Sequence, residues 1–212
     1  MAGKFRFTYN APVVLTFAVA STVVLLWSEY VNADAMRYFA AWPEFHGAPS
    51  YIGLFSHVLG HAGWDHLLGN FSMILLIGPI LEERHGSKGL LGMIAITALV
   101  TGLVQVTIGD GFLVGASGIV FMMILLASMA NIRAGEIPLT FVAVAVLYLG
   151  REVVAAFDDD KISQMAHLIG GVTGAAFGFL GAGPSTPRPG KPARPVVAAA
   201  APPPTAPRLP KD

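Results

Sequence analysis

Apolar residues along the chain gather into six long stretches, which cover residues 12–27, 66–81, 89–108, 117–130, 138–154 and 162–180. Several approach the roughly 20 residues that a helix needs to cross the hydrocarbon of a bilayer. The stretches are separated by charged, glycine-containing or proline-containing breaks at 82–86, 109–111, 131–138 and 158–161, which are typical of helix ends. The pattern predicts an all-α membrane protein with six transmembrane helices.

The composition agrees with a polytopic membrane protein. Hydrophobic residues make up 54% of the 212 residues and charged residues 12%, with a mean hydropathy of +0.64. Soluble domains carry about 25% charged residues. The formal net charge of +0 leaves no basic field to attract nucleic acid. The lack of cysteine excludes disulfides, thiolate zinc sites and a cysteine nucleophile.

The sequence divides into three regions. We expect a short cytoplasmic N-terminus at 1–11, a six-helix membrane domain at 12–182 and a tail at 183–212. Ten of the fifteen prolines lie in this tail, mixed with alanine and basic residues. Such a segment buries too little apolar surface to offset its ordering entropy, so the tail is predicted to be disordered and cytoplasmic.

The positions of lysine and arginine predict the orientation. With the N-terminus inside, ten of the thirteen fall in inner segments, and only Arg37, Arg151 and Lys161 fall in outer ones. Inner loops of membrane proteins carry the excess of these residues. Both termini are therefore expected in the cytoplasm.

The first apolar stretch has an alternative interpretation. Lys4 and Arg6, the apolar run and the triplet 33–35 (Ala-Asp-Ala) imitate a secretory signal with its cleavage site. The apolar region of a signal is usually about 7–15 residues, and this one lies at or beyond that limit. We favour a retained first helix; cleavage would leave five spans.

Strongly polar side chains occur in three of the six stretches. His66 and Asn70 lie in the second, Ser117 begins the fourth, and His167 lies near the start of the sixth. In the orientation above, these three helices run from outside to inside, so all four residues share the outer part of the membrane. Such residues inside spans are costly and usually functional.

The fourth stretch is short. From 117 to 130 it has 14 residues, or about 21 Å of helix, against roughly 30 Å of hydrocarbon. Its helix must begin below the outer surface, after a glycine-rich loop. Irregular backbone at that depth is tolerated where it lines a wet cavity. We expect Ser117 at the floor of such a pocket, with Gly115 allowing close backbone approach.

The sixth stretch supplies a base for this serine. Gly170, Gly174 and Gly178 share one helix face, a pattern that lets membrane helices touch. Close approach to Gly118 would bring His167 to the Ser117 hydroxyl, and a Ser–His pair is the minimal activated nucleophile. The N–H donors of His66 and Asn70, spaced i, i+4, would point at a developing oxyanion.

Each element also has a structural interpretation. A serine at a helix start is commonly a cap or packing residue, a glycine ladder commonly serves packing, and a histidine in a span is commonly a hydrogen-bonded structural group. His57, His61 and His66 also suit a metal, since His57 and His61 are spaced i, i+4. There is no HExxH sequence and no carboxylate at ligand spacing, so we expect neither metal nor cofactor.

The ordered set of motifs resembles the rhomboid family of intramembrane serine proteases. The matching stretches are HVLGHAGWDHLLGN (57–70), EERHGS (82–87), GASG (115–118) and AHLIG (166–170). With six spans, the resemblance covers roughly residues 12–180.

The resemblance implies a serine endopeptidase of the bacterial inner membrane, with its active site toward the outer side. It implies a Ser117–His167 dyad without a third carboxylate, and an oxyanion hole from His66, Asn70 and the Ser117 N–H. Substrates would be transmembrane or membrane-anchored proteins in the lipid bilayer. Supporting roles fall to His61, Gly115, Gly118, Phe121, Gly170, Glu82 and Arg84.

The sequence departs from the family pattern at two places. Residues 49–51 (Pro-Ser-Tyr) stand where many bacterial members have an adjacent Trp-Arg pair, and Phe121 stands where many have a tyrosine that stacks on the catalytic histidine. Neither change removes a catalytic group. The alternatives are an inactive rhomboid-like protein that binds transmembrane helices, and a small-molecule transporter. A transporter typically has broken helices in symmetric repeats, which we do not find in this sequence.

Overall fold

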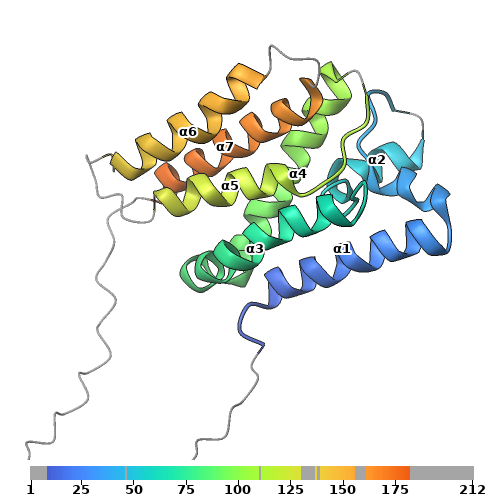
Figure 1. The fold of residues 1–212 in the computed structure, drawn as a ribbon, viewed down its shortest axis with the longest axis horizontal. Coiled ribbons are helices and arrows are strands. Elements are labelled where there is room, and N and C mark those ends of the chain that lie inside the picture. Colours follow the sequence, from blue (N-terminus) through green and yellow to red (C-terminus); the bar gives the residue numbers. More distant parts are fainter. Residues whose placement is uncertain are drawn as a thin grey trace, which may run out of the picture.

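The computed structural model describes residues 9–45, 47–109, 111–129, 137, 139–155 and 161–181. Within them the chain forms seven α-helices and one 3-10 helix (Figure 1): α1 (Pro12–Tyr30), η1 (Ala33–Phe39), α2 (Ala48–Ser56), α3 (Trp64–His85), α4 (Ser87–Ile108), α5 (Ser117–Ser128), α6 (Leu139–Ala155) and α7 (Lys161–Gly181). The predicted tail and most of the predicted N-terminal segment lie outside the described residues.

Each of the six apolar stretches corresponds to one helix, namely α1, α3, α4, α5, α6 and α7. The prediction of a helical membrane protein is therefore confirmed. In the described part of the chain, α1, α3 and α4 are long and apolar enough to cross a membrane, and α5 is a shorter apolar helix. The sequence analysis did not predict η1 and α2, which lie between the first two long helices.

Helix α5 lies in the middle of the bundle. Residues 118–126 are all buried, and the helix contacts α3, α4, α6 and α7 (Figure 1). A helix that is apolar on every side has to be enclosed by other helices or by lipid. Its burial explains why so short a helix is so strongly apolar.

Helix α1 is fastened to α3 at both ends. At its start, the Glu82 carboxylate accepts the N–H groups of Val13 and Val14 at 3.0 and 3.1 Å. At its end, the indole N–H of Trp64 donates to the Glu29 carboxylate at 3.0 Å. Four N–H groups at a helix start lack partners within the helix, so a buried carboxylate there satisfies two of them. These contacts favour a first helix that is part of the folded domain.

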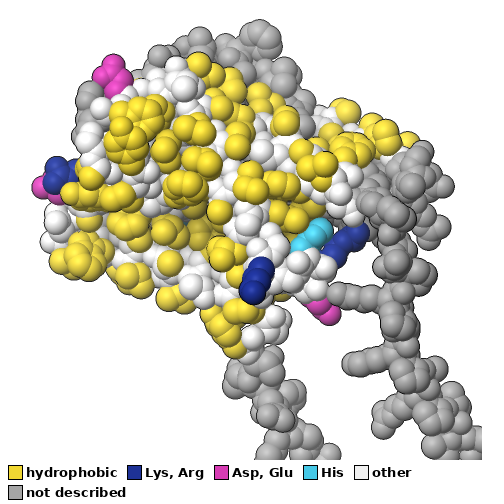
Figure 2. All heavy atoms as spheres, turned by 180° about the vertical axis from the view of Figure 1, so that it is seen from behind, with side chains coloured by type: hydrophobic (Ala, Val, Ile, Leu, Met, Phe, Trp, Pro, Cys, Tyr) yellow, Lys and Arg dark blue, Asp and Glu magenta, His cyan; other side chains and the backbone are white. Residues whose placement is uncertain are grey.

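A broad apolar surface covers the outside of the bundle. Figure 2 shows hydrophobic side chains over most of one face, with charged side chains near its margins. On α3, for example, Leu76 and Ile80 are 68% and 67% exposed. Contiguous apolar surface of this extent is rare on soluble monomers, and here it suits contact with lipid chains.

Candidate active site

Ser117 is the first residue of α5, and its position depends on an unusual backbone turn. Gly115 has φ +111°, in the left-handed region that favours glycine, and Ala116 precedes the helix without a side-chain cap. The N–H groups of the first turn are thus not satisfied by a capping side chain. Ser117 is half-buried, so its hydroxyl lies beside helix N–H donors at a partly accessible site.

The segment before Ser117 is held from two sides. Leu113 and Ala41 exchange two backbone hydrogen bonds, at 2.9 and 2.8 Å, in an isolated antiparallel bridge. The Gly115 N–H donates to the His57 carbonyl at 2.9 Å. Because these bonds come from the chain between α1 and α3, that region fixes where α5 begins.

Helix α7 touches α5 backbone to backbone. A Cβ at Gly170 would overlap the Gly118 carbonyl, and a Cβ at Gly174 would overlap the Met122 carbonyl. The contact therefore requires both glycines, as the small-residue spacing predicts. It places the α7 segment that carries His167 beside the first turn of α5.

The His167 imidazole stacks on the Phe121 ring, with ring centroids 4.4 Å apart and an interplanar angle of 6°. Phe121 and Ser117 are spaced i, i+4 and share one face of α5. The base candidate thus lies on the same side of α5 as the candidate nucleophile.

His66 and Asn70 of α3 face the backbone immediately before Ser117. A Cβ built on Gly115 would lie 2.6 Å from His66 Nε2 and 3.5 Å from Asn70 Nδ2. His66 Nδ1 accepts the Ala62 N–H at 3.4 Å, so a neutral ring carries its proton on Nε2, the ring nitrogen that faces Gly115. Asn70 Nδ2 is buried without a hydrogen-bond partner in the described part of the chain. Both donors are therefore available to a group bound near Ser117.

Two further histidines, His57 and His61, lie just outside α3 and are buried. Burial lowers the pKa of each from 6.5 to about 4. His57 Nδ1 and Nε2 lie 2.9 Å from the Gly53 carbonyl and 3.1 Å from the Thr101 hydroxyl. Since both of its ring nitrogens have protein partners, His57 is a structural group rather than a metal ligand.

His61 supports the ring of His66. Its Nδ1 is 3.2 Å from the Leu59 carbonyl, and its ring meets His66 edge to face with centroids 5.1 Å apart. It also packs against Phe71 at 5.8 Å. These contacts restrict the orientation of the His66 ring.

Residues 48–184, well over half of the chain, match the Rhomboid domain family. The chain belongs to the rhomboid family. It is 37% identical over 138 residues to Rhomboid-related protein 1 of Caenorhabditis elegans, covering 59% of this chain but only 38% of that protein. It is 22% identical to Rhomboid protease GlpG of Haemophilus influenzae, over 79% of this chain and 90% of the relative. It is 26% identical to Rhomboid protease GlpG of Serratia proteamaculans, over 79% of this chain and 62% of the relative.

Glu82 and Arg84 of this rhomboid lie at the other end of α3 from His66, far from Ser117. Besides bonding α1, the Glu82 carboxylate accepts the Ser87 hydroxyl at 2.7 Å. Gly86, between α3 and α4, has φ +75°. Glu82 therefore joins three helices, whereas Arg84 is exposed. Their place is structural, and the fold does not bring them to the candidate site.

One residue close to the site was missed by the sequence analysis. Gln105 of α4 is 5% exposed, and its Nε2 donates to the Gly111 carbonyl at 2.6 Å, in the loop before Ser117. A polar side chain in an apolar stretch is the same signal that identified His66 and Asn70. The same reasoning could therefore have identified Gln105 from the sequence.

Proposed function

We propose that this rhomboid is an intramembrane serine endopeptidase that cleaves transmembrane or membrane-anchored proteins with a Ser117–His167 dyad. The observation that carries the proposal is the convergence of three helices at one end of the bundle. Gly170 of α7 packs on Gly118 in the first turn of α5, and His167 stacks on Phe121. His66 and Asn70 of α3 lie beside Gly115, two residues before Ser117.

In the proposed reaction, His167 accepts the Ser117 proton as Oγ attacks the scissile carbonyl carbon. The oxyanion of the tetrahedral intermediate accepts hydrogen bonds from His66 Nε2, Asn70 Nδ2 and the Ser117 N–H. His167 then protonates the leaving amine, and an acyl group remains on Ser117. Water, deprotonated by His167, hydrolyses this ester and restores the hydroxyl.

The dyad needs no partner carboxylate in this proposal. Phe121 holds the imidazole plane by stacking, a task that a hydrogen-bonded carboxylate performs in soluble serine proteases. Phenylalanine keeps the stacking face that the family's tyrosine would offer and lacks only its hydroxyl.

We further propose that residues 12–182 form the protease domain with six spans, both termini in the cytoplasm and the active site toward the outer side of a bacterial inner membrane. The excess of inner lysine and arginine supports this orientation. The contacts of α1 with Glu82 and Trp64 support a first span that is retained.

The test is cleavage of a single-span reporter protein by the purified protein in liposomes. We expect wild type to cut the reporter and Ser117→Ala to leave it intact, with unchanged helix content. Ser128→Ala is the matched control, since Ser128 lies at the other end of α5 and donates to the Leu125 carbonyl. His66→Ala and Asn70→Ala should each lower kcat by roughly 10²–10³-fold.

Cleavage by Ser117→Ala at the wild-type rate would exclude the serine mechanism. If wild type and Ser117→Ala both bind a panel of reporters without cutting any, the inactive helix-binding alternative replaces the proposal.

A further inference from the structure

Thr101 of α4 lies between the segment before α3 and the first turn of α5. Its side chain is buried, with 3% of the residue exposed. Its Oγ1 lies 3.1 Å from His57 Nε2, and a Cβ built on Gly118 would lie 3.3 Å from its Cγ2. The hydroxyl group therefore contacts His57, while the methyl group borders the residue that follows Ser117. No step of the proposed reaction uses Thr101.

The hydrogen bonds of His57 determine which group the Thr101 hydroxyl binds. His57 Nδ1 lies 2.9 Å from the Gly53 carbonyl, which can only accept, so Nδ1 carries a proton. Burial lowers the pKa of His57 to about 4, so at neutral pH the ring is neutral and Nε2 is an acceptor. The carbonyls of Thr97 and Ala98 also lie 2.9 and 3.0 Å from Oγ1, but helix carbonyls already accept backbone N–H groups. The hydroxyl proton is therefore directed at His57 Nε2, because a buried acceptor is costly to leave unpaired.

His57 and Thr101 together hold the chain on both sides of Ser117. The Gly115 N–H, two residues before Ser117, donates to the His57 carbonyl at 2.9 Å. The Thr101 methyl group lies against Gly118, directly after Ser117. The ring and the carbonyl of one histidine thus tie the two contacts together, and Ser117 lies between them.

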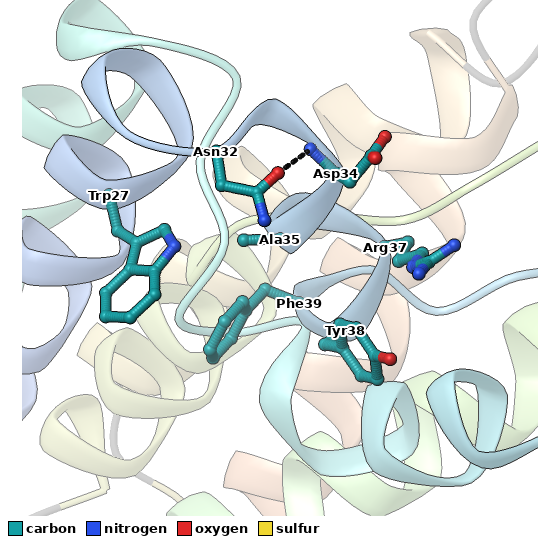
Figure 3. Close-up of a pocket in the computed structure, with 7 residues that line it drawn as sticks. All are labelled: Trp27, Asn32, Asp34, Ala35, Arg37, Tyr38 and Phe39. Atoms are coloured by element: carbon teal, nitrogen blue, oxygen red, sulfur yellow. Dashed lines mark hydrogen bonds between the residues drawn. The ribbon is translucent and has the colours of Figure 1, made fainter.

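The backbone that supports these contacts is closely packed. A Cβ at Gly102, next in the chain on α4, would overlap the backbone of α2, and one at Gly53 of α2 would overlap the Ala40 carbonyl, directly after η1. Figure 3 shows η1 beside the end of α1, where the Asn32 side chain accepts the Asp34 N–H at 3.0 Å. Closely packed elements transmit strain instead of absorbing it. A change in the side chain at 101 should therefore displace the start of α5.

We propose that Thr101 is a positioning residue for the Ser117 nucleophile, an inference that rests on the proposed protease function. The hydroxyl bond to His57 keeps the side chain in the rotamer that presents its methyl group to Gly118. The methyl group sets the place of the first turn of α5, and with it the direction of Ser117 Oγ toward His167. Thr101 itself touches neither the substrate nor the reacting atoms.

The test separates the two contacts by substitution in the full-length protein in liposomes. Thr101→Ser keeps the hydroxyl and loses the methyl group, whereas Thr101→Val keeps the shape and loses the hydroxyl. Misplacing a reacting group by about 1 Å costs on the order of 10²-fold in rate, so displacements of about 0.3–0.5 Å should lower kcat about four- to tenfold. We expect this loss in both variants at equal concentrations of folded protein, with KM unchanged. The rate of fluorophosphonate labelling of Ser117 should fall by a similar factor.

Thr107→Ser and Thr107→Val are the matched controls. Thr107 is an exposed threonine of α4, and its hydroxyl donates to the Leu103 carbonyl at 2.9 Å. Both controls should match wild type in kcat and in labelling rate.

A loss of Tm in the Thr101 variants, with kcat and labelling per folded molecule as in wild type, would overturn the proposal and leave Thr101 a packing residue. A raised KM at unchanged kcat would overturn it too. A wild-type protein that neither cuts the reporter nor is labelled would refute the proposed function and this inference together. An active wild type with unaffected Thr101 variants refutes the inference alone.

Discussion

The ring of Phe121 lies parallel to the imidazole of His167, 4.4 Å away between centroids. The two residues come from α5 and α7, the helices that touch through Gly118 and Gly170. Because Phe121 is one turn beyond Ser117, the helix that carries the proposed nucleophile also sets the plane of the proposed base.

Replacing Phe121 should therefore affect turnover more than substrate binding. An aromatic pair contributes about 0.5–1.5 kcal/mol beyond its buried area, so we expect Phe121→Leu to lower kcat by about 2- to 13-fold with little change in KM. Phe121→Tyr should retain most activity. The measurement is kcat and KM for cleavage of a reporter, with both variants compared at the same concentration of folded protein. Equal kcat for Phe121→Leu and wild type would show that the stacking does not position His167.

The close contact of α5 with α7 should tolerate no side chain. Gly170→Ala would place a methyl group on the Gly118 carbonyl, so the helices must separate, at a cost of about 1–3 kcal/mol or more, and activity should fall with Tm. Gly92→Ala is the control, because a Cβ on Gly92 in α4 meets nothing within 4 Å. Thermal unfolding in detergent compares them; a Gly170→Ala protein as stable as Gly92→Ala would contradict the packing.

Glu82 should matter for stability and not for chemistry. Glu82→Ala leaves the Val13 and Val14 N–H groups and the Ser87 hydroxyl without their partner. The expected cost is about 1–3 kcal/mol for each group that stays buried and unpaired. Glu83→Ala, at the neighbouring exposed carboxylate, should change Tm little. A Tm loss of equal size in both variants would mean that Glu82 does not anchor α1.

Stability should fall in mild acid because of His57 and His61. Burial holds the pKa of each near 4 in the folded protein, against 6.5 for an unperturbed ring. The unfolded chain therefore binds protons that the folded one excludes, and the stabilisation is complete above about pH 6.5 and is lost as the pH falls toward 4.

Thermal unfolding across this range measures the slope of stability against pH. His57→Gln removes one of the two groups, so its slope should be shallower than that of wild type whatever its stability at neutral pH. Parallel curves for the two proteins would refute this origin of the acid sensitivity.

The long helices could be predicted from the sequence because a bilayer demands long apolar runs, and polar residues within them are few. That scarcity made His66, Asn70, Ser117 and His167 stand out, and the packing of Gly170 followed from small-residue spacing. Their catalytic roles stay predictions. Gln105 carried the same signal and was overlooked.

The region between α1 and α3 could not be predicted in this way. Helix α2 is short and depends on distant partners: Gly53 packs on the Ala40 carbonyl, and Gly102 of α4 packs on Leu54. The bridge between Ala41 and Leu113 joins segments far apart in sequence. No local periodicity reports contacts of this kind, so they emerge only from the folded chain.

The most direct test of the Ser117–His167 dyad is covalent labelling of the purified protein with a fluorophosphonate, followed by intact-mass measurement and peptide mapping. The probe reacts with a serine only when a base activates it. We predict one adduct, on Ser117, in wild type and in Ser128→Ala, and none in Ser117→Ala or in folded His167→Ala. An adduct on another serine, or undiminished labelling of Ser117 in the His167→Ala protein, would contradict the dyad.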